Sequence, residues 1–295
     1  MIIIVWLALI VLALWFSYFL TKDFLKHKNN LENVSWIKTA LIGFVVNFFD
    51  VLGIGAFAPQ TALLKFTHQT KDKQIPGTMN VANTLPVLAQ AIIFIRVIEV
   101  EPVTLIIMLA TATLGAVIGA GIVSKLSEKM VRLVMGVALL VTAGFMLAKQ
   151  LDWIEGGGTG IGLYGGKLVI AATVNFILGA LMTAGIGLYA PCMALVFVLG
   201  LSPKVAFPIM MGSCAFLMPT ASFKFIRAGA YNRKAAVSMA IPGIVAVLIA
   251  AFIVKQLQLE TLRWIVIAVI LYTSVTMLSA YFSKKEEKKS MAVET

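Results

Sequence analysis

The sequence has few charged side chains and very few side chains that bind metals. Charged residues make up 13% of the 295 residues, whereas soluble domains carry about 25%. Two cysteines and two histidines supply neither a disulfide framework nor a ligand set for zinc. No Walker A loop, nucleophile elbow or dinucleotide-binding glycine motif stands in a suitable context. These absences exclude a disulfide-stapled secreted domain, and we expect no enzyme, no cofactor and no metal site.

Apolar side chains are what the sequence has in excess. Hydrophobic residues account for 60% of the chain, and the mean hydropathy is +0.98. No soluble globule of this size could hide that much apolar surface. The composition therefore predicts an all-α polytopic membrane protein whose first partner is the lipid bilayer. The net charge of +11 then indicates the orientation of the loops rather than a nucleic-acid partner.

Seven uncharged stretches have the length of one membrane crossing, which needs about 20 residues. They are 1–21, 74–95, 102–124, 133–148, 205–223, 235–254 and 264–283. The first has no basic n-region and no clear cleavage site, so we interpret it as a retained N-terminal helix. Within 102–124, Gly115 and Gly119 have the spacing of a helix-packing face. Residues 284–295 are rich in charge and predict a solvated tail.

Two further apolar segments, 39–64 and 168–203, do not fit single crossings. The second has 36 residues without a charge and would be about 54 Å long as one helix. It is also too short for two crossings and a turn. Both segments carry glycine and proline in the middle, and these residues break helices. We therefore expect two broken, re-entrant helical hairpins.

The two unusual segments resemble each other in sequence. Gly53–Pro59 reads GIGAFAP and Gly185–Pro191 reads GIGLYAP, identical at five of seven positions with an offset of 132. The same offset aligns further pairs, such as Pro76 with Pro208. Such an ordered run of matches predicts an internal duplication. Its parts would be a first repeat at 37–149, a glycine-rich linker at 150–165 and a second repeat at 166–283.

The positions of lysine and arginine favour opposite orientations for the two repeats. If each broken segment returns to its own side, 18 of the 24 basic residues fall on one side. Basic residues gather in cytoplasmic loops. We therefore predict inverted repeats, each with one hairpin and three spans. The N-terminus would lie outside and the C-terminus in the cytosol.

Broken helices in inverted repeats place a substrate site near the middle of the bilayer. The N-terminus of each half-helix offers free N–H groups and a positive dipole end, which favour an anion. The alternative is that the glycines and prolines serve only helix packing. Residues predicted to bind substrate are Asn47, Gly53, Gly55, Pro59, Gln60, Thr61, Asn80, Asn83, Asn175, Gly185, Gly187, Pro191, Cys192 and Ser213.

Asp50 is the only acidic residue well inside an apolar segment. A carboxylate within a membrane is costly and marks a functional candidate. Asn47 precedes it by three residues, on the same face of a helix. We predict that Asp50 carries a coupling proton, and coordination of a coupling cation is the other functional interpretation. A structural Asp–Asn pair, or an aspartate that stays wet near the interface, is the alternative.

The stretch from Asn47 to Thr61, followed by PGTMN at 76–80, resembles the TauE/SafE sulfite exporter family, the TSUP permeases. The resemblance implies transport of a small sulfur-containing or organic anion, such as sulfite, a sulfonate or thiosulfate, across a bacterial-type inner membrane. Many members have three or more consecutive glycines, and Ala56 and Leu188 interrupt that run here. An anion channel and a membrane scaffold without transport remain alternatives. The sequence leaves a homodimer open.

Overall fold

The computed structural model describes residues 2–51, 55–94, 100–153, 158–185, 187–253 and 260–282. These ranges hold no β-strand, only an isolated bridge between Gly160 and Leu201. The α-helices are α1 Ile2–His27, α2 Trp36–Val51, α3 Phe57–Phe66, α4 Ile75–Phe94, α5 Pro102–Val123, α6 Glu128–Gln150, α7 Gly165–Met182, α8 Tyr189–Val198, α9 Pro203–Ala228, α10 Arg233–Ile253 and α11 Glu260–Phe282. A short 3₁₀ helix, η1, covers Asp72–Gln74. The predicted all-helical architecture is confirmed for the described residues.

After α1, the helices fall into two series of five, α2–α6 and α7–α11, with matching lengths. The same pairs of helices touch when each helix of one series is replaced by its counterpart in the other series. Helix α2 packs on α10 as α7 packs on α5, and α4 packs on α10 as α9 packs on α5. Helices α4 and α9 contact each other, and so do α6 and α11. This is the pattern that a two-fold relation between the series produces.

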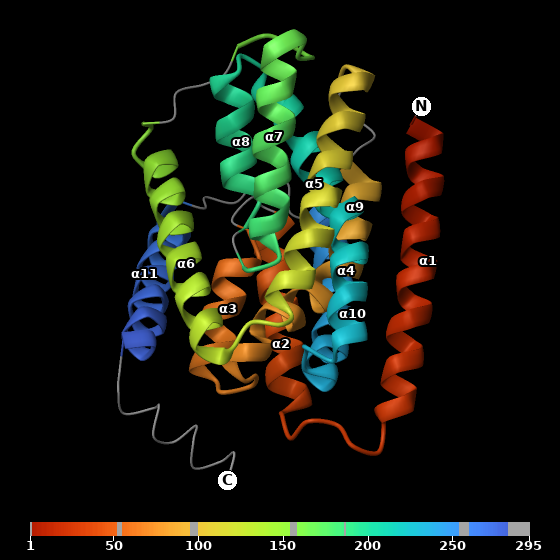
Figure 1. Ribbon diagram of the computed structural model, residues 1–295, viewed down its shortest axis with the longest axis vertical. Coiled ribbons are helices and arrows are strands. Elements are labelled where there is room, and N and C mark those ends of the chain that lie inside the picture. The colour runs from red at the N-terminus through yellow and green to blue at the C-terminus, as the bar shows by residue number, and fades with distance from the viewer. Residues whose placement is uncertain are drawn as a thin grey trace.

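In each series the first helix ends and a short second helix begins a few residues later. Helix α2 ends at Val51 and α3 begins at Phe57, and α7 ends at Met182 and α8 begins at Tyr189. Helices α2 and α3 lie in the lower half of Figure 1, and α7 and α8 lie in the upper half. Each connection contains a glycine in the left-handed region, Gly55 with φ +88° and Gly185 with φ +108°, which only glycine adopts without strain. The segments 39–64 and 168–203 are therefore each divided into two helices.

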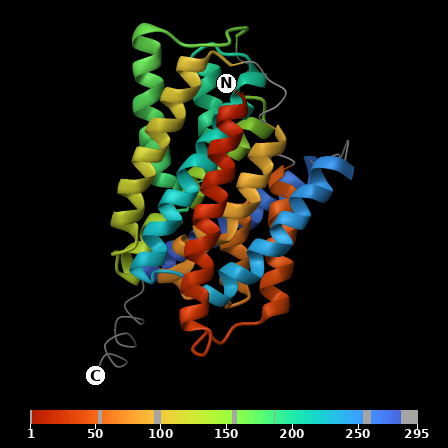
Figure 2. The same ribbon diagram turned by 90° about the vertical axis from the view of Figure 1, so that its right-hand side faces the viewer.

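Six described helices are long and apolar enough to cross a membrane. One of them is α7, Gly165–Met182, which the sequence predicts as part of a hairpin. Helix α4, which lies in the predicted crossing 74–95, is not among them. Helix α4 is less apolar because it carries a buried row of asparagine, threonine and glutamine side chains. Helix α1 lies on the outside of the bundle (Figure 2), against α9 and α4. It continues to His27, beyond the predicted limit at residue 21, because charged residues end an apolar run without ending a helix.

Small residues allow the backbones of α5 and α7 to approach closely. A Cβ atom added to Gly115 would lie 1.9 Å from the carbonyl oxygen of Phe176, and one added to Gly179 would lie 2.1 Å from that of Ala112. The corresponding pair, α2 and α10, has a similar approach at Gly43, 2.4 Å from the oxygen of Met239. The packing role predicted for Gly115 agrees with this geometry. These contacts fix where α2 and α7, and hence the two breaks, lie.

Buried ion pairs hold the lower end of the molecule in Figure 1 together. The Asp72 carboxylate in η1 bonds the Lys65 ammonium and, at 2.9 Å, the Arg132 Nε of α6. A second network joins α1 to the α9–α10 turn, where Tyr231 donates to Asp23 at 2.6 Å and Arg233 Nε donates to the same carboxylate at 2.8 Å. Burial and the bond to Asp23 raise the pKa of Tyr231 well above its usual value.

Candidate functional site

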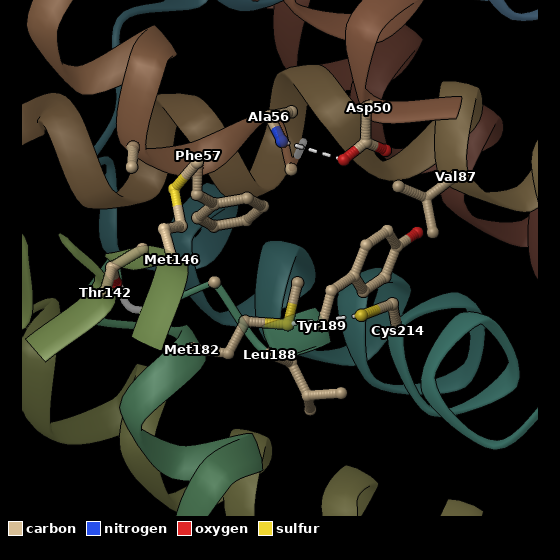
Figure 3. Close-up of a pocket in the computed structure, with 13 residues that line it drawn as sticks. Asp50, Ala56, Phe57, Val87, Thr142, Met146, Met182, Leu188, Tyr189 and Cys214 are labelled. Carbon is tan, nitrogen blue, oxygen red and sulfur yellow. Dashed lines mark hydrogen bonds between the residues drawn. The ribbon is translucent and has the colours of Figure 1, made fainter. Parts of the chain in front are cut away.

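A cavity lies between the turns of the two hairpins (Figure 3). The volume of this cavity is about 40 Å³. One water needs about 10–15 Å³ on this measure, so the cavity holds a few water-sized groups. The lining residues are Asp50, Gly55, Ala56, Phe57, Ala58, Val87, Thr142, Met146, Met182, Gly187, Leu188, Tyr189 and Cys214.

Most of the lining residues come in pairs that are 132 positions apart. This is the offset that aligns the two glycine motifs, and it relates Asp50 to Met182, Gly55 to Gly187, Ala56 to Leu188 and Phe57 to Tyr189. The cavity therefore lies between the α2–α3 connection and the α7–α8 connection.

Two half-helices begin at this cavity. Helix α3 starts at Phe57 and α8 starts at Tyr189, and both residues line the space. The N–H groups of a first helical turn have no partner within the helix, and they carry the positive end of its dipole. Pro59 and Pro191 are the third residues of these helices, where the missing N–H removes no helical bond. Two positive helix ends facing one small space suit a small anion.

Among the described residues that line the cavity, Asp50 is the only charged one. It lies in the last turn of α2 and is 4% exposed. Its Oδ1 accepts a hydrogen bond of 2.7 Å from the N–H of Ala56, across the break (Figure 3). A buried charge with one hydrogen bond is expensive. Asp50 thus places a group that can gain or lose a proton beside the two helix ends.

The second half contributes a hydroxyl and a thiol to the cavity. The Tyr189 hydroxyl donates to Oε1 of Gln90 on α4 at 3.1 Å. Cys214 of α9 lies 3.7 Å, sulfur to sulfur, from Met182. Figure 3 shows the Tyr189 ring directed toward the wall that carries Asp50, with its hydroxyl on that side. Asp50, Tyr189 and Cys214 therefore lie on one side of the cavity, opposite Met146 and Thr142 of α6.

Several predicted site residues form a buried hydrogen-bonded chain behind the cavity wall. Asn47 Nδ2 donates to Oδ1 of Asn83 at 3.1 Å and to the Gly43 carbonyl at 2.8 Å. The Asn83 amide donates in turn to Oε1 of Gln60, and Gln60 Nε2 donates to the Met239 sulfur at 3.2 Å. All three amides are fully buried. The chain joins α2, α3, α4 and α10, so it holds the first hairpin in place.

A second group of predicted residues also bonds to protein rather than lining the cavity. Asn175 Nδ2 donates to the Met108 carbonyl at 2.7 Å and to the Ser213 hydroxyl at 3.2 Å, which ties α7 to α5 and α9. Asn80 Nδ2 donates to the Pro76 carbonyl at 2.9 Å and to that of Thr183 at 3.4 Å. The Oδ1 atoms of Asn47, Asn80 and Asn175 are buried without a protein partner.

The remaining predicted residues have varied surroundings. Gly55 and Gly187 line the cavity, whereas Gly53 lies outside the described residues. Gly185 packs beside Met79 and Met135. The Thr61 hydroxyl donates to the Phe57 carbonyl at 2.9 Å and to the Met79 sulfur at 3.0 Å. Cys192 is fully buried in the first turn of α8 and is not among the lining residues.

Sequence reasoning did not select Tyr189, Cys214, Val87 or the α6 residues Thr142 and Met146 for this site. A signal existed for Tyr189, because it aligns with Phe57 in the repeated motif and differs from it by a hydroxyl. None existed for α6, since an apolar span shows no preference for which of its residues face a cavity. The described residues contain no cluster of three His, Cys, Asp or Glu side chains that could hold a metal ion.

Comparison with known protein families gives one match over nearly the whole chain. The family described as Sulfite exporter TauE/SafE matches residues 1–146 and 168–294, two blocks that correspond closely to the two helical series and leave out the connection between them. Comparison with curated proteins and with solved structures gave no match. The family match and the apolar helices identify a membrane transport protein of the permease type. The chain therefore belongs to the TauE/SafE sulfite exporter family.

Proposed function

We propose that this protein is a secondary transporter that moves a small oxyanion through the cavity between the two hairpins. The observation that carries the proposal is the pairing of the lining residues. Asp50 with Met182, Gly55 with Gly187, Ala56 with Leu188 and Phe57 with Tyr189 are related by one offset and face one space. A site on the axis between inverted repeats is reached alternately from either side when one repeat rocks against the other.

The exchange of helix contacts between the two series supports inverted repeats with re-entrant hairpins. The turns of the hairpins lie at mid-height in Figure 1 and their ends point toward opposite faces. In this arrangement the lower end of Figure 1, with Lys65, Asp72 and Arg132, faces the cytosol of a bacterial-type cell. The N-terminus then lies outside and the C-terminus inside.

The size of the cavity limits the cargo. Space for a few water-sized groups suits an ion with a central sulfur or carbon and two or three oxygens. Sulfite, thiosulfate and the head group of a sulfonate or a small carboxylate are of this kind. The free N–H groups at the starts of α3 and α8 would bind the oxygens. The amides of Asn47, Gln60, Asn80, Asn83 and Asn175 support these helices. The unpaired oxygens of Asn47, Asn80 and Asn175 accommodate water.

Asp50 couples this movement to a proton. An anion about 4 Å from an ionised carboxylate would be repelled by about 4 kcal/mol at an effective dielectric constant of 20. Since about 1.4 kcal/mol is tenfold in affinity, the repulsion weakens binding roughly a thousandfold. Protonation of Asp50 removes that repulsion. The anion therefore binds together with a proton, and a pH gradient drives its transport.

The test is anion flux in proteoliposomes with an imposed pH gradient. Wild-type protein should accumulate sulfite or thiosulfate in saturable fashion, and Asp50→Asn should abolish the dependence on the gradient while the anion still protects the protein from thermal unfolding. Asp152→Asn, which changes an exposed aspartate, is the matched control and should resemble the wild type. Flux that never saturates would indicate a channel. The absence of both flux and thermal protection with every anion would reject transport by this site.

A further inference from the structure

The two polar differences between the repeats meet in the cavity. At one lining pair the first half has Asp50 where the second has Met182, and at another the second half has Tyr189 where the first has Phe57. Each half thus supplies one polar group that the other lacks. Figure 3 shows the Tyr189 hydroxyl on the same side of the cavity as the Asp50 carboxyl group. The two halves can therefore affect each other through the Asp50 carboxyl group and the Tyr189 hydroxyl.

The hydrogen bonds of Tyr189 are only partly satisfied in the present arrangement. Its hydroxyl donates to Gln90 Oε1 at 3.1 Å. Gln90 is fully buried, and its Nε2 has no hydrogen-bond partner in the structure. A buried donor without a partner is unfavourable, so the present bond between the two side chains is not the only one available to them.

We propose that Tyr189 and Gln90 form a switch that reports the protonation state of Asp50 to the second hairpin. In one arrangement, which the structure shows, the Tyr189 hydroxyl donates to Gln90 Oε1. In the other, the Gln90 amide turns over, its Nε2 donates to the Tyr189 oxygen, and the Tyr189 hydrogen points to the ionised Asp50 carboxylate. The second arrangement gives the charged carboxylate a hydrogen-bond donor. It also gives Gln90 Nε2, which has no partner in the structure, an acceptor.

The position of Tyr189 connects this exchange to the bound anion. It is the first residue of α8, so a shift of its side chain moves the N-terminus that the proposed function assigns to the anion. With Asp50 protonated, the hydroxyl bonds Gln90 and α8 has the arrangement that receives the anion. With Asp50 ionised, the hydroxyl is drawn to the carboxylate and α8 shifts. Tyr189 and Gln90 are thus positioning residues that act through α8.

The surroundings of Asp50 contain few other groups that titrate. Tyr189 of α8 and Cys214 of α9 line the same cavity as Asp50. The charged residues of α10, Arg233 and Lys234, lie in its first turn, and α3 has only Lys65, in its last turn. Helix α4 carries no charged residue. The switch therefore responds to Asp50 itself.

This inference rests on the proposed function, and the experiment separates the two. The melting temperature of the full-length protein in detergent is followed from pH 5 to pH 9. Wild-type protein should show a pH-dependent step that Asp50→Asn removes. Tyr189→Phe removes one donor to the charged carboxylate, so the step should move by about one pH unit. Gln90→Met, of similar size, should move it in the same sense by a smaller amount.

Flux measurements in proteoliposomes complete the test. Tyr189→Phe should still be protected by sulfite but should lose most of the gradient-driven accumulation, at least about tenfold, and combining it with Asp50→Asn should cause no further loss. Tyr272→Phe, which removes an exposed hydroxyl on α11, is the control and should match the wild type in both assays.

A pH-dependent step that stays in place in Tyr189→Phe would overturn the switch, and so would a wild-type step that Asp50→Asn leaves intact. These two outcomes concern the switch alone. If the step behaves as expected but no anion protects or crosses, the switch stands and the proposed cargo is wrong.

Discussion

Replacing Gly115 with alanine tests how the second hairpin is positioned. Gly115 lies in α5 where this helix crosses α7. The added Cβ would be 1.9 Å from the carbonyl oxygen of Phe176 and 2.8 Å from its carbonyl carbon. A Cβ contact below 3.0 Å does not occur in real structures. Because both neighbouring atoms belong to backbone, no change of rotamer can relieve the clash, and the two helices must separate.

The magnitude follows from these distances. Reaching 3.0 Å requires a displacement of about 1.1 Å, and reaching an ordinary contact of 3.4 Å requires about 1.5 Å. Overpacking of this kind costs about 1–3 kcal/mol, and the rigid neighbours place Gly115→Ala near the upper limit. Alanine recovers about 1 kcal/mol through its higher helix propensity. The net loss of unfolding free energy should be about 2 kcal/mol.

Gly121 provides the matched control, since it lies in the same helix and an added Cβ there meets nothing within 4 Å. Gly121→Ala should be neutral or slightly stabilising. Unfolding by denaturant in detergent micelles measures both variants against the wild type. Because α7 ends at Met182, which lines the cavity, Gly115→Ala should also lose its protection by sulfite. Equal stability of the two alanine variants would refute the close packing of α5 on α7.

Two further predictions concern the ends of the molecule. Asp72→Asn removes the charge of a buried carboxylate that the partly buried Lys65 and Arg132 side chains share, and should cost about 2 kcal/mol of unfolding free energy. Glu128→Gln, which changes an exposed partner of Arg132, should cost less than about 1 kcal/mol, and denaturant unfolding distinguishes the two variants. Glu101 caps α5. Its carboxylate accepts hydrogen bonds from the hydroxyl and the N–H of Thr104 and from the N–H of Val103, and these hold the pKa of Glu101 below its usual value. Its stabilisation should therefore be complete above its usual pKa and be lost as the pH falls through the lowered value, so Glu101→Gln should flatten the acid limb of a melting-temperature profile.

The sequence was sufficient for the all-helical membrane class of the fold, because long apolar runs favour helices that cross a bilayer. The described residues form helices and no strand, and six of these helices are long and apolar enough to cross a membrane. The duplicated motif and the positions of the basic residues predict an inverted repeat and an orientation, which stay predictions. The motif also indicated where the cavity lies, since Gly55 and Gly187 line it. The offset between the two motifs proved to relate the lining residues as well, from Asp50 to Tyr189.

The roles of individual polar residues were harder to predict. A buried asparagine that faces a cavity and one that faces a neighbouring helix look the same in the sequence, because each is a polar residue within an apolar segment. Asn83 bonds Gln60, and Asn175 bonds Ser213, so these side chains have partners within the protein. Which way each points depends on the rotation of its helix, and that is set by packing at residues such as Gly43. Tyr189, by contrast, reaches the cavity because it begins a half-helix.

Anomalous X-ray diffraction from crystals grown with selenite tests the central claim most directly. Selenite has the shape and charge of sulfite, and its selenium atom can be located independently of the protein. The account predicts one selenium peak in the cavity, between the starts of α3 and α8 and beside Asp50, that disappears when the crystals are soaked with excess sulfite. Selenium found only at surface lysines, with the cavity empty at saturating selenite, would contradict it.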